Sequence, residues 1–203
     1  MFRDRLDAAE HLAERLSHLK GSNPLVLAIP RGGVPMGRYL ADALEGELDV
    51  VLVRKLRAPG NPEFAIGAIS EDGTMKLDEA ASHYPQAAIE REAEQQRKLL
   101  LQRRERYNPV RPPIAPEGRT VVIVDDGSAT GATMEAALKT LQGRAEHLIA
   151  ALGVASTSAV DRLAAVADEV VCLEVPPRFM AVGQFYVDFG QVEEAEVMEL
   201  LEE

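Results

Sequence analysis

One stretch of the sequence decides the fold: Val121-Val122-Ile123-Val124-Asp125-Asp126-Gly127-Ser128-Ala129-Thr130-Gly131-Ala132-Thr133. Its four apolar β-branched residues are typical of a strand that is covered on both faces. Two adjacent carboxylates at the end of a buried strand need partners, so we expect them to face a ligand crevice. The small residues that follow lead into a helix, whose free N–H groups form a cradle for an anion. Acidic groups suit ribose hydroxyls, so the stretch predicts a site for a ribose 5-phosphate.

The same stretch resembles the motif with which type I phosphoribosyltransferases bind phosphoribosyl pyrophosphate (PRPP): four apolar residues, two acidic residues and a phosphate loop. The resemblance implies that Asp125 and Asp126 are catalytic residues, which hold the ribose hydroxyls and stabilise positive charge at the anomeric carbon. It implies that the 5-phosphate is bound by Gly127, Ser128, Ala129, Thr130, Gly131, Ala132 and Thr133. A Walker A loop and a nucleophile elbow fit less well, because neither Gly-Lys-Ser/Thr nor Gly-x-Ser-x-Gly occurs in the stretch.

The composition is that of an ordinary globular chain, with 203 residues, 46% hydrophobic residues and a net charge of −11. The acidic balance argues against broad nucleic-acid binding, which depends on Lys and Arg. No apolar run approaches the roughly 20 residues of a membrane-spanning helix, and the N-terminus lacks the apolar core of a secretion signal. Cys172 is the only cysteine, so no disulfide can form within the chain. We expect a cytoplasmic protein without membrane or nucleic-acid partners.

The apolar runs alternate with helical patterns along the chain. This alternation predicts an α/β fold with an open, mainly parallel twisted sheet and helices on both faces. The expected strands are 25–29, 48–53, 121–124, 148–154 and 170–173. We expect a single domain, 1–203, with a core of about 21–175, an insertion of about 58–116 and a small C-terminal hood of about 176–203.

The loop Ile29-Pro30-Arg31-Gly32-Gly33 follows the first expected strand. Its glycines allow a ligand to approach the backbone closely, and Arg31 adds a cation. The loop resembles the pyrophosphate loop of the family, which often contains a non-proline cis peptide. The resemblance implies that Arg31, Gly32 and Gly33 bind pyrophosphate. It assigns the same role to the basic pair Arg54-Lys55 after the second expected strand, with Lys55 the first choice and also a catalytic candidate.

The insertion contains two different elements. The turn-rich segment Ala58–Glu63 and the Asp72-Gly73 turn predict a hairpin. By position this hairpin resembles the mobile catalytic loop of the family, which folds over PRPP and excludes water. Residues 86–107 are rich in Glu, Arg and Gln with a thin apolar stripe, which predicts a long exposed helix. That helix either covers an edge of the protein or pairs with another subunit as a homodimer.

The C-terminal region from Phe179 to Phe189 is aromatic but irregular, and it lies where the family places a hood over the nucleobase. Phe179, Phe185 and Tyr186 are the candidate base contacts. One position departs from part of the family. Members that act on 6-oxopurines carry an aspartate just before the loop threonine, whereas this chain has Ala129. That departure removes one acid–base route and leaves the general acid or base unassigned.

The resemblance implies a PRPP-dependent phosphoribosyltransferase, which transfers the 5-phosphoribosyl group to a nitrogen nucleophile, a nucleobase, and releases pyrophosphate. Mg²⁺ is the implied cofactor, carried mainly by the diphosphate and ribose hydroxyls, with Asp125 and Asp126 as the candidate protein ligands. Two alternatives stay open. One is a non-catalytic sensor of PRPP or nucleotides on the same fold. The other is a Rossmann-type nucleotide-binding protein, although Gly-x-Gly-x-x-Gly is absent from the first loop. The acceptor, whether purine, pyrimidine or another amine, stays open.

Overall fold

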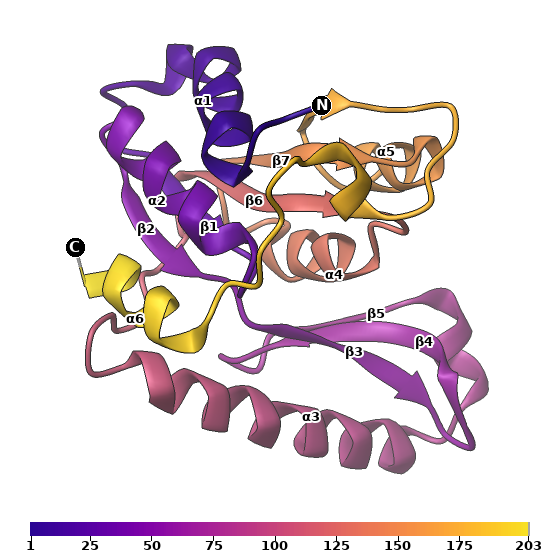
Figure 1. Cartoon of the computed structure of the whole chain (residues 1–203). Helices are drawn as coiled ribbons and strands as arrows, with labels where there is room; N and C mark the ends of the chain where they lie inside the picture. The colour runs from indigo at the N-terminus through magenta and orange to yellow at the C-terminus, as the bar shows by residue number, and fades with distance from the viewer. Residues whose placement is uncertain (203) are drawn as a thin grey trace.

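The computed structural model describes residues 1–202, and its centre is a sheet of five parallel strands (Figure 1). In spatial order the strands are β2 (Glu47–Val50), β1 (Leu25–Ala28), β6 (Thr120–Ser128), β7 (His147–Ala155) and β8 (Glu169–Glu174). All neighbouring pairs are parallel. The α/β class and the parallel sheet that the apolar runs predicted are therefore confirmed.

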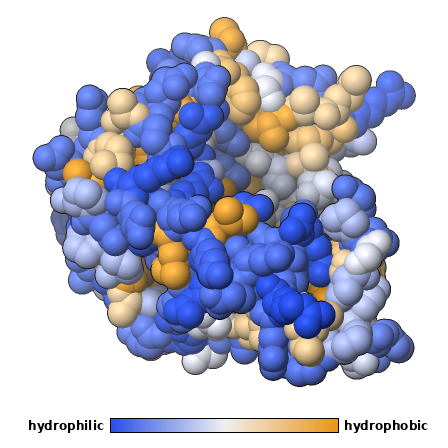
Figure 2. All heavy atoms as spheres, turned by 90° about the horizontal axis from the view of Figure 1, so that it is seen from below, coloured by the Kyte–Doolittle hydropathy of each residue, from blue (hydrophilic) through white to orange (hydrophobic). Residues whose placement is uncertain are grey.

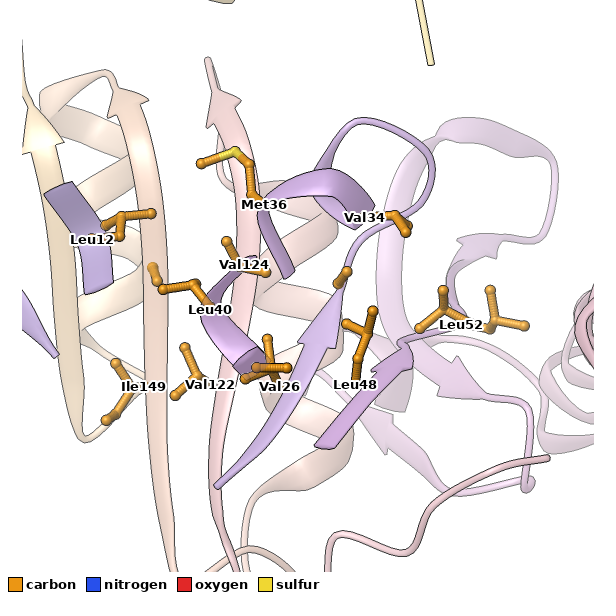
Figure 3. Close-up of a cluster of buried hydrophobic side chains, with 14 of the residues drawn as sticks. Leu12, Val26, Val34, Met36, Leu40, Leu48, Leu52, Val122, Val124 and Ile149 are labelled. Carbon is orange, nitrogen blue, oxygen red and sulfur yellow. The ribbon is translucent and has the colours of Figure 1, made fainter. Parts of the chain in front are cut away.

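Helices cover both faces of this sheet, as expected. One face carries α1 (Arg5–Arg15), which a short 3₁₀ turn (Ser17–Leu19) follows, and α2 (Gly33–Ala43). The other face carries α4 (Ala132–Leu141) and α5 (Thr157–Ala164). Figure 3 shows the first interface, where Leu40 of α2 points toward Val122 and Val124 of β6. The alternate residues of β6, Val121 and Ile123, belong to the cluster on the opposite face. Because both faces are buried, the run of apolar residues in β6 is continuous rather than alternating.

The second expected strand is wrong in its extent. Residues 48–53 form not one strand but the end of β2 and the start of β3 (Val53–Ala58), which belongs to a separate antiparallel sheet. This small sheet consists of β3, β4 (Asn61–Ser70) and β5 (Met75–Leu77). The Asp72-Gly73 turn joins β4 to β5 as predicted, and Gly73 has the positive φ of +88° that such a turn requires. Arg54 and Lys55 therefore lie within β3, not at the end of a parallel strand.

The long helix α3 (Gln86–Tyr107) follows a short 3₁₀ turn (Glu79–His83) and spans the predicted range. It packs on β3 and β4 and buries Ile89 and Leu100. The helix therefore covers a sheet of its own chain, which is one of the two roles expected for it. Seen from below, the molecule is mainly hydrophilic with a few separate hydrophobic residues (Figure 2).

The C-terminal segment returns to the N-terminus before it ends on α2. Phe2 N–H donates to Phe185 O, and Val187 N–H donates to Phe2 O, both at 2.8 Å. A 3₁₀ turn (Val182–Phe185) lies within this segment, and α6 (Glu194–Glu202) packs against α2 (Figure 1). The segment 176–192 thus borders the sheet, whereas α6 extends the layer formed by α2. No helix within residues 1–202 is long and apolar enough to cross a membrane.

Candidate functional site

The strand order creates a crevice between β1 and β6. These strands are neighbours, but the helices that follow them, α2 and α4, lie on opposite faces of the sheet. Ligands of open α/β sheets bind at such a point, outside the carboxyl ends of the strands. A cavity of about 430 Å³ lies here. It is lined by Arg5, Ile29, Pro30, Arg31, Gly32, Asp125, Asp126, Phe189, Gly190, Gln191 and Val192. The structure therefore brings the first glycine loop and the two aspartates together.

The two loops approach each other so closely that only glycine fits. A Cβ atom added to Gly32 would lie 2.3 Å from Oδ2 of Asp126, and one added to Gly33 would lie 2.6 Å from the carbonyl oxygen of Val124. The peptide bond between Pro30 and Arg31 is cis, as the family resemblance implied. The glycines thus let the backbone of this loop line the same cavity as the Asp126 carboxylate.

The two aspartates are held in a poorly solvated position. Asp125 is half-buried and Asp126 is buried. Burial raises the pKa of Asp125 well above its usual range, and the neighbouring Asp126 carboxylate raises it further. Burial also raises the pKa of Asp126, although a hydrogen bond from Arg5 Nε at 2.9 Å opposes this shift. A ligand that brings hydroxyl donors or a cation would offset the negative charge.

The pair provides two carboxylates that could bind a cation together with a ligand. Mg²⁺ is bound through one or two carboxylates together with substrate phosphates and waters. Asp125 and Asp126 line the cavity and are the residues that could supply these carboxylates. Among residues 1–202 there is no group of three or more His, Cys, Asp or Glu side chains placed to hold a metal ion.

The loop between β6 and α4 ends at a helix N-terminus, the part of a helix that can bind an anion. Gly131 has a φ of +72° and precedes the first residue of α4. Its N–H donates to Ser128 Oγ at 2.7 Å, and the N–H of Ala132 donates to Thr130 Oγ1 at 3.3 Å. The first N–H groups of α4, including that of Thr133, have no partner within the helix. The loop thus concentrates hydroxyls and amides at the positive end of a helix dipole.

Gly127 at the end of β6 and Ala129 in the loop both have neighbours in the sheet layer. A Cβ added to Gly127 would lie 2.7 Å from the carbonyl oxygen of Val154, so this glycine allows β6 and β7 to pair closely. The carbonyl oxygen of Ala129 accepts a hydrogen bond from Ser156 Oγ at 2.6 Å. Ser156 also caps α5, so the phosphate loop is anchored to the next strand–helix junction.

Lys55 and Arg54 lie apart from the cavity that contains Arg31. Lys55 lines two neighbouring cavities of about 300 and 280 Å³ between the small sheet and the start of α4, where Thr133 lies in the first. Arg54 instead turns toward α3, where its Nε donates to Gln96. The structure therefore places Lys55 beside the start of α4, and does not bring it to Arg31.

The aromatic residues of the C-terminal segment are not arranged as expected. Phe179 and Phe185 stack on each other with ring centroids 5.7 Å apart and pack on the core. Tyr186 is buried, and its hydroxyl donates to the carbonyl oxygen of Asp126 at 2.7 Å. None of these three residues lines the cavity of the two aspartates. The aromatic residue that does so is Phe189.

Arg5 is the residue of the site that the sequence did not reveal. It lies 121 positions from its partner Asp126, and it begins a helix whose pattern predicts only packing. No local motif marks it, because its role depends on where α1 rests on the sheet.

Together, the fold and the crevice define an α/β protein with a cavity at the carboxyl ends of its central parallel strands. Comparison with known proteins gives the family: the phosphoribosyl transferase domain family matches residues 3–189. The chain belongs to this family. The strand order also rules out the Rossmann alternative, because β2-β1-β6-β7-β8 corresponds to the order 2-1-3-4-5 instead of 3-2-1-4-5-6.

The relatives cover the whole chain. Two Mycobacterium tuberculosis proteins named "Putative phosphoribosyl transferase", from strains H37Rv and CDC 1551, are each 43% identical over 206 aligned residues. These cover 100% of this chain but 46% of each relative, so the chain spans about half the length of the curated relatives it matches. The crystal structure of TT1426 from Thermus thermophilus is 51% identical, with a TM-score of 0.92, and the match covers 100% of this chain and 98% of that chain.

Proposed function

We propose that the chain binds PRPP with Mg²⁺ and transfers its 5-phosphoribosyl group to a nitrogen nucleophile, a nucleobase, with release of pyrophosphate. One observation carries this proposal: the glycine loop after β1 and the aspartate pair line one cavity, and the residues that follow these aspartates lead directly into the N-terminus of α4. A nucleoside monophosphate would need only the aspartates and the phosphate loop. The additional loop with Arg31, Gly32 and Gly33 provides the place for a pyrophosphate group.

Each part of the crevice has a role in this proposal. The loop from Gly127 to Thr133 binds the 5-phosphate, and Asp125 and Asp126 accept hydrogen bonds from the ribose hydroxyls. The carboxylates also stabilise the positive charge that develops at the anomeric carbon. As the bond between that carbon and the pyrophosphate oxygen breaks, the new bond to nitrogen forms. Arg31 and Lys55 supply cations for the leaving pyrophosphate, and Mg²⁺ bound with Asp125 and Asp126 would provide further positive charge there.

The small sheet is the proposed lid of the site. Its strand β3 places Lys55 over the start of α4, on the side of the crevice opposite the C-terminal segment. Closure of this sheet over PRPP would carry Lys55 toward the pyrophosphate and exclude water, which would otherwise capture the oxocarbenium-like transition state. In this role β3–β5 correspond to the mobile catalytic loop of the family.

Titration of PRPP with and without Mg²⁺ tests the binding step. We expect Asp125→Asn and Asp126→Asn each to weaken binding about tenfold or more, because hydrogen bonds to charged groups contribute about 1.5–3 kcal/mol. Asp161→Asn is the matched control, because Asp161 is an exposed carboxylate on α5 outside the crevice. Failure of the wild-type chain to bind PRPP, or undiminished binding in both crevice variants, would refute the proposal.

A non-catalytic PRPP sensor is the second candidate, and two observations favour it. Phe179, Phe185 and Tyr186 do not line the crevice, and Ala129 removes one acid–base route. Release of pyrophosphate, measured with a panel of purines, pyrimidines and other amines, separates the two. Release with one acceptor establishes the transferase and names the acceptor. Tight PRPP binding without release for any acceptor establishes the sensor.

A further inference from the structure

Arg5 connects the aspartate pair to the C-terminal segment. Its Nε donates to Oδ2 of Asp126 at 2.9 Å, and its Nη1 donates to the carbonyl oxygen of Gly190 at 2.7 Å. The guanidinium also lies over the ring of Phe189, with Cζ 4.1 Å from the ring centroid. We call these four residues, Arg5, Asp126, Phe189 and Gly190, the Arg5 clasp. All four line the cavity of the aspartate pair.

The clasp restrains one oxygen of the Asp126 carboxylate. Its Oδ2 accepts from Arg5 on one side, and Gly32 lies so close on another that a Cβ there would reach 2.3 Å. The side chain of Arg5 is only 14% exposed, so its hydrogen bond to the carboxylate is largely shielded from water. A planar guanidinium with several fixed donors holds an acceptor in a defined direction. The orientation of Asp126 is therefore set before any ligand arrives.

The clasp also restrains the segment 188–192. Phe189 is held between two partners, since its ring stacks on Tyr186 at a centroid distance of 5.1 Å and carries the Arg5 guanidinium. Tyr186 in turn donates to the backbone of Asp126. Residues 188–192 form the outer wall of the crevice. Arg5 therefore holds both this wall and the Asp126 carboxylate.

Arg5 is not needed to hold α1 in place. Asp4 caps the helix by accepting from the N–H of Asp7 at 2.8 Å, and Ala8, Ala9 and Leu12 are buried against the sheet. The side chain of Arg5 instead extends from the first turn into the crevice. Its contacts go to the candidate site, not to the core beneath α1.

We propose that Arg5 is a positioning residue of the phosphoribosyl site: it orients the Asp126 carboxylate for the ribose hydroxyls and fixes residues 188–192 as the outer wall. This inference rests on the proposed function. It goes beyond that proposal because it makes α1 a part of the site.

The test uses Arg5→Lys, which keeps the charge but offers a single ammonium in place of the guanidinium fork. One ammonium cannot reproduce the paired contacts with Asp126 and Gly190 in the same geometry. The matched control is Arg3→Lys, because the Arg3 side chain is 77% exposed and pairs with Asp7, while its backbone contact with Asp188 does not depend on the side chain. Three quantities are measured in both variants: amide hydrogen exchange of residues 188–192 without ligand, PRPP affinity with Mg²⁺, and the affinity for inorganic pyrophosphate with Mg²⁺.

We expect Arg5→Lys to accelerate exchange in this segment and to weaken PRPP binding, each by about tenfold, as for the loss of one charge-assisted hydrogen bond. Pyrophosphate affinity should stay within about twofold, because the charge is retained. Equal losses for both ligands would indicate general loosening and overturn the positioning role, as would PRPP affinity equal to wild type. Unchanged exchange would overturn the anchoring of the wall. If the wild-type chain binds no PRPP, the proposed function fails, while the exchange data still decide the anchoring.

Discussion

Two adjacent carboxylates at the end of β6 are unfavourable for the stability of the chain at neutral pH. The pKa values of Asp125 and Asp126 are both raised in the folded chain. A carboxyl with a raised pKa binds more protons in the folded state, so the stability falls as the pH rises from the unfolded value through the folded one. A loss of folding stability of this kind is typical of functional sites, where residues are selected for activity at the expense of stability.

We therefore expect Asp125→Asn to stabilise the chain near pH 8. The amide carries no charge, and its oxygen can still accept the hydrogen bond that the N–H of Asp126 donates at 2.9 Å. A gain of about 2–4 °C in Tm would correspond to about 1 kcal/mol in a chain of this length. Thermal unfolding measured from pH 3 to pH 8 checks the sign, since the gain should vanish below pH 4. A Tm below wild type at pH 8 would contradict it.

Gly32 gives a second prediction at this scale. Gly32→Ala would place a methyl group 2.3 Å from Oδ2 of Asp126, so the carboxylate must move. We expect PRPP affinity to fall at least tenfold, the scale of one lost hydrogen bond to a charged group. The backbone of Gly32 is helical, with a φ of −58°, so alanine is not strained there. Asp161→Asn on α5, outside the crevice, again serves as the control.

The residues of the site differ in how much of their role the sequence could reveal. Asp125, Asp126 and the phosphate loop lie in one continuous stretch, where strand, carboxylates and helix start are all local features. Arg5 and Phe189 reach the same cavity from opposite ends of the chain. Their placement depends on how α1 and the C-terminal segment pack, which no local pattern encodes. Tyr186 is a predicted base contact. In the structure it is buried, and its hydroxyl donates to the backbone of Asp126, so it does not line the cavity.

At the scale of elements, the main error concerns the transition from β2 to β3. Val51 and Leu52 continue the apolar run of β2, so the pattern predicts one strand to Val53. The chain instead leaves the parallel sheet after Val50 and enters the small sheet. Hydrophobic periodicity reports burial but not which sheet a strand joins. The same limit applies to α3, whose extent was predicted but whose buried ion pairs were not.

The small sheet is tied to the core by Arg104 of α3. Its guanidinium donates to Asp49 of β2 at 3.0 Å and to Glu71, next to β4, at 2.7 Å, and Arg104 and Asp49 are both buried. Burial raises the pKa values of the Asp49 and Glu71 carboxyls, although Arg104 opposes this shift in both. The three charges therefore depend on one another.

We expect Arg104→Met to destabilise the chain by about 3–5 kcal/mol, because it leaves buried carboxylates without their cation. The loss should shrink as the pH falls toward 4 and the carboxyls become protonated. Lys98→Met on the same helix is the control, since Lys98 makes only an exposed pair with Glu94, and such pairs contribute about 0.5 kcal/mol. Denaturant unfolding at pH 5 and pH 8 measures both. A loss below 1 kcal/mol at pH 8 would show that the triad is not a structural link.

At the scale of the molecule, the site lies where three parts of the chain meet. In the proposed function, the parallel sheet contributes the aspartates and the loop before α4, the two ends of the chain contribute the Arg5 clasp, and the small sheet contributes Lys55 from the neighbouring cavities. The sequence predicted the parallel sheet apart from the extent of its second strand, because alternating strands and helices determine this architecture. It predicted the small sheet as a hairpin only in outline. It did not predict that the N-terminal helix and the C-terminal segment close one wall together.

A ligand that contacts all three parts should stabilise the whole chain cooperatively. At a PRPP concentration of 100 Kd, binding to the folded state alone adds about 2.7 kcal/mol, which corresponds to a rise of about 5–10 °C in Tm at this chain length. We expect this rise with Mg²⁺ and PRPP but not with ribose, which lacks the phosphate and pyrophosphate groups. Differential scanning calorimetry provides the measurement, with hydrogen exchange read in parallel in β3, α1 and the segment 188–192. Protection of the phosphate loop alone would mean that the ligand contacts only the parallel sheet, and that the small sheet and the clasp are not parts of the site.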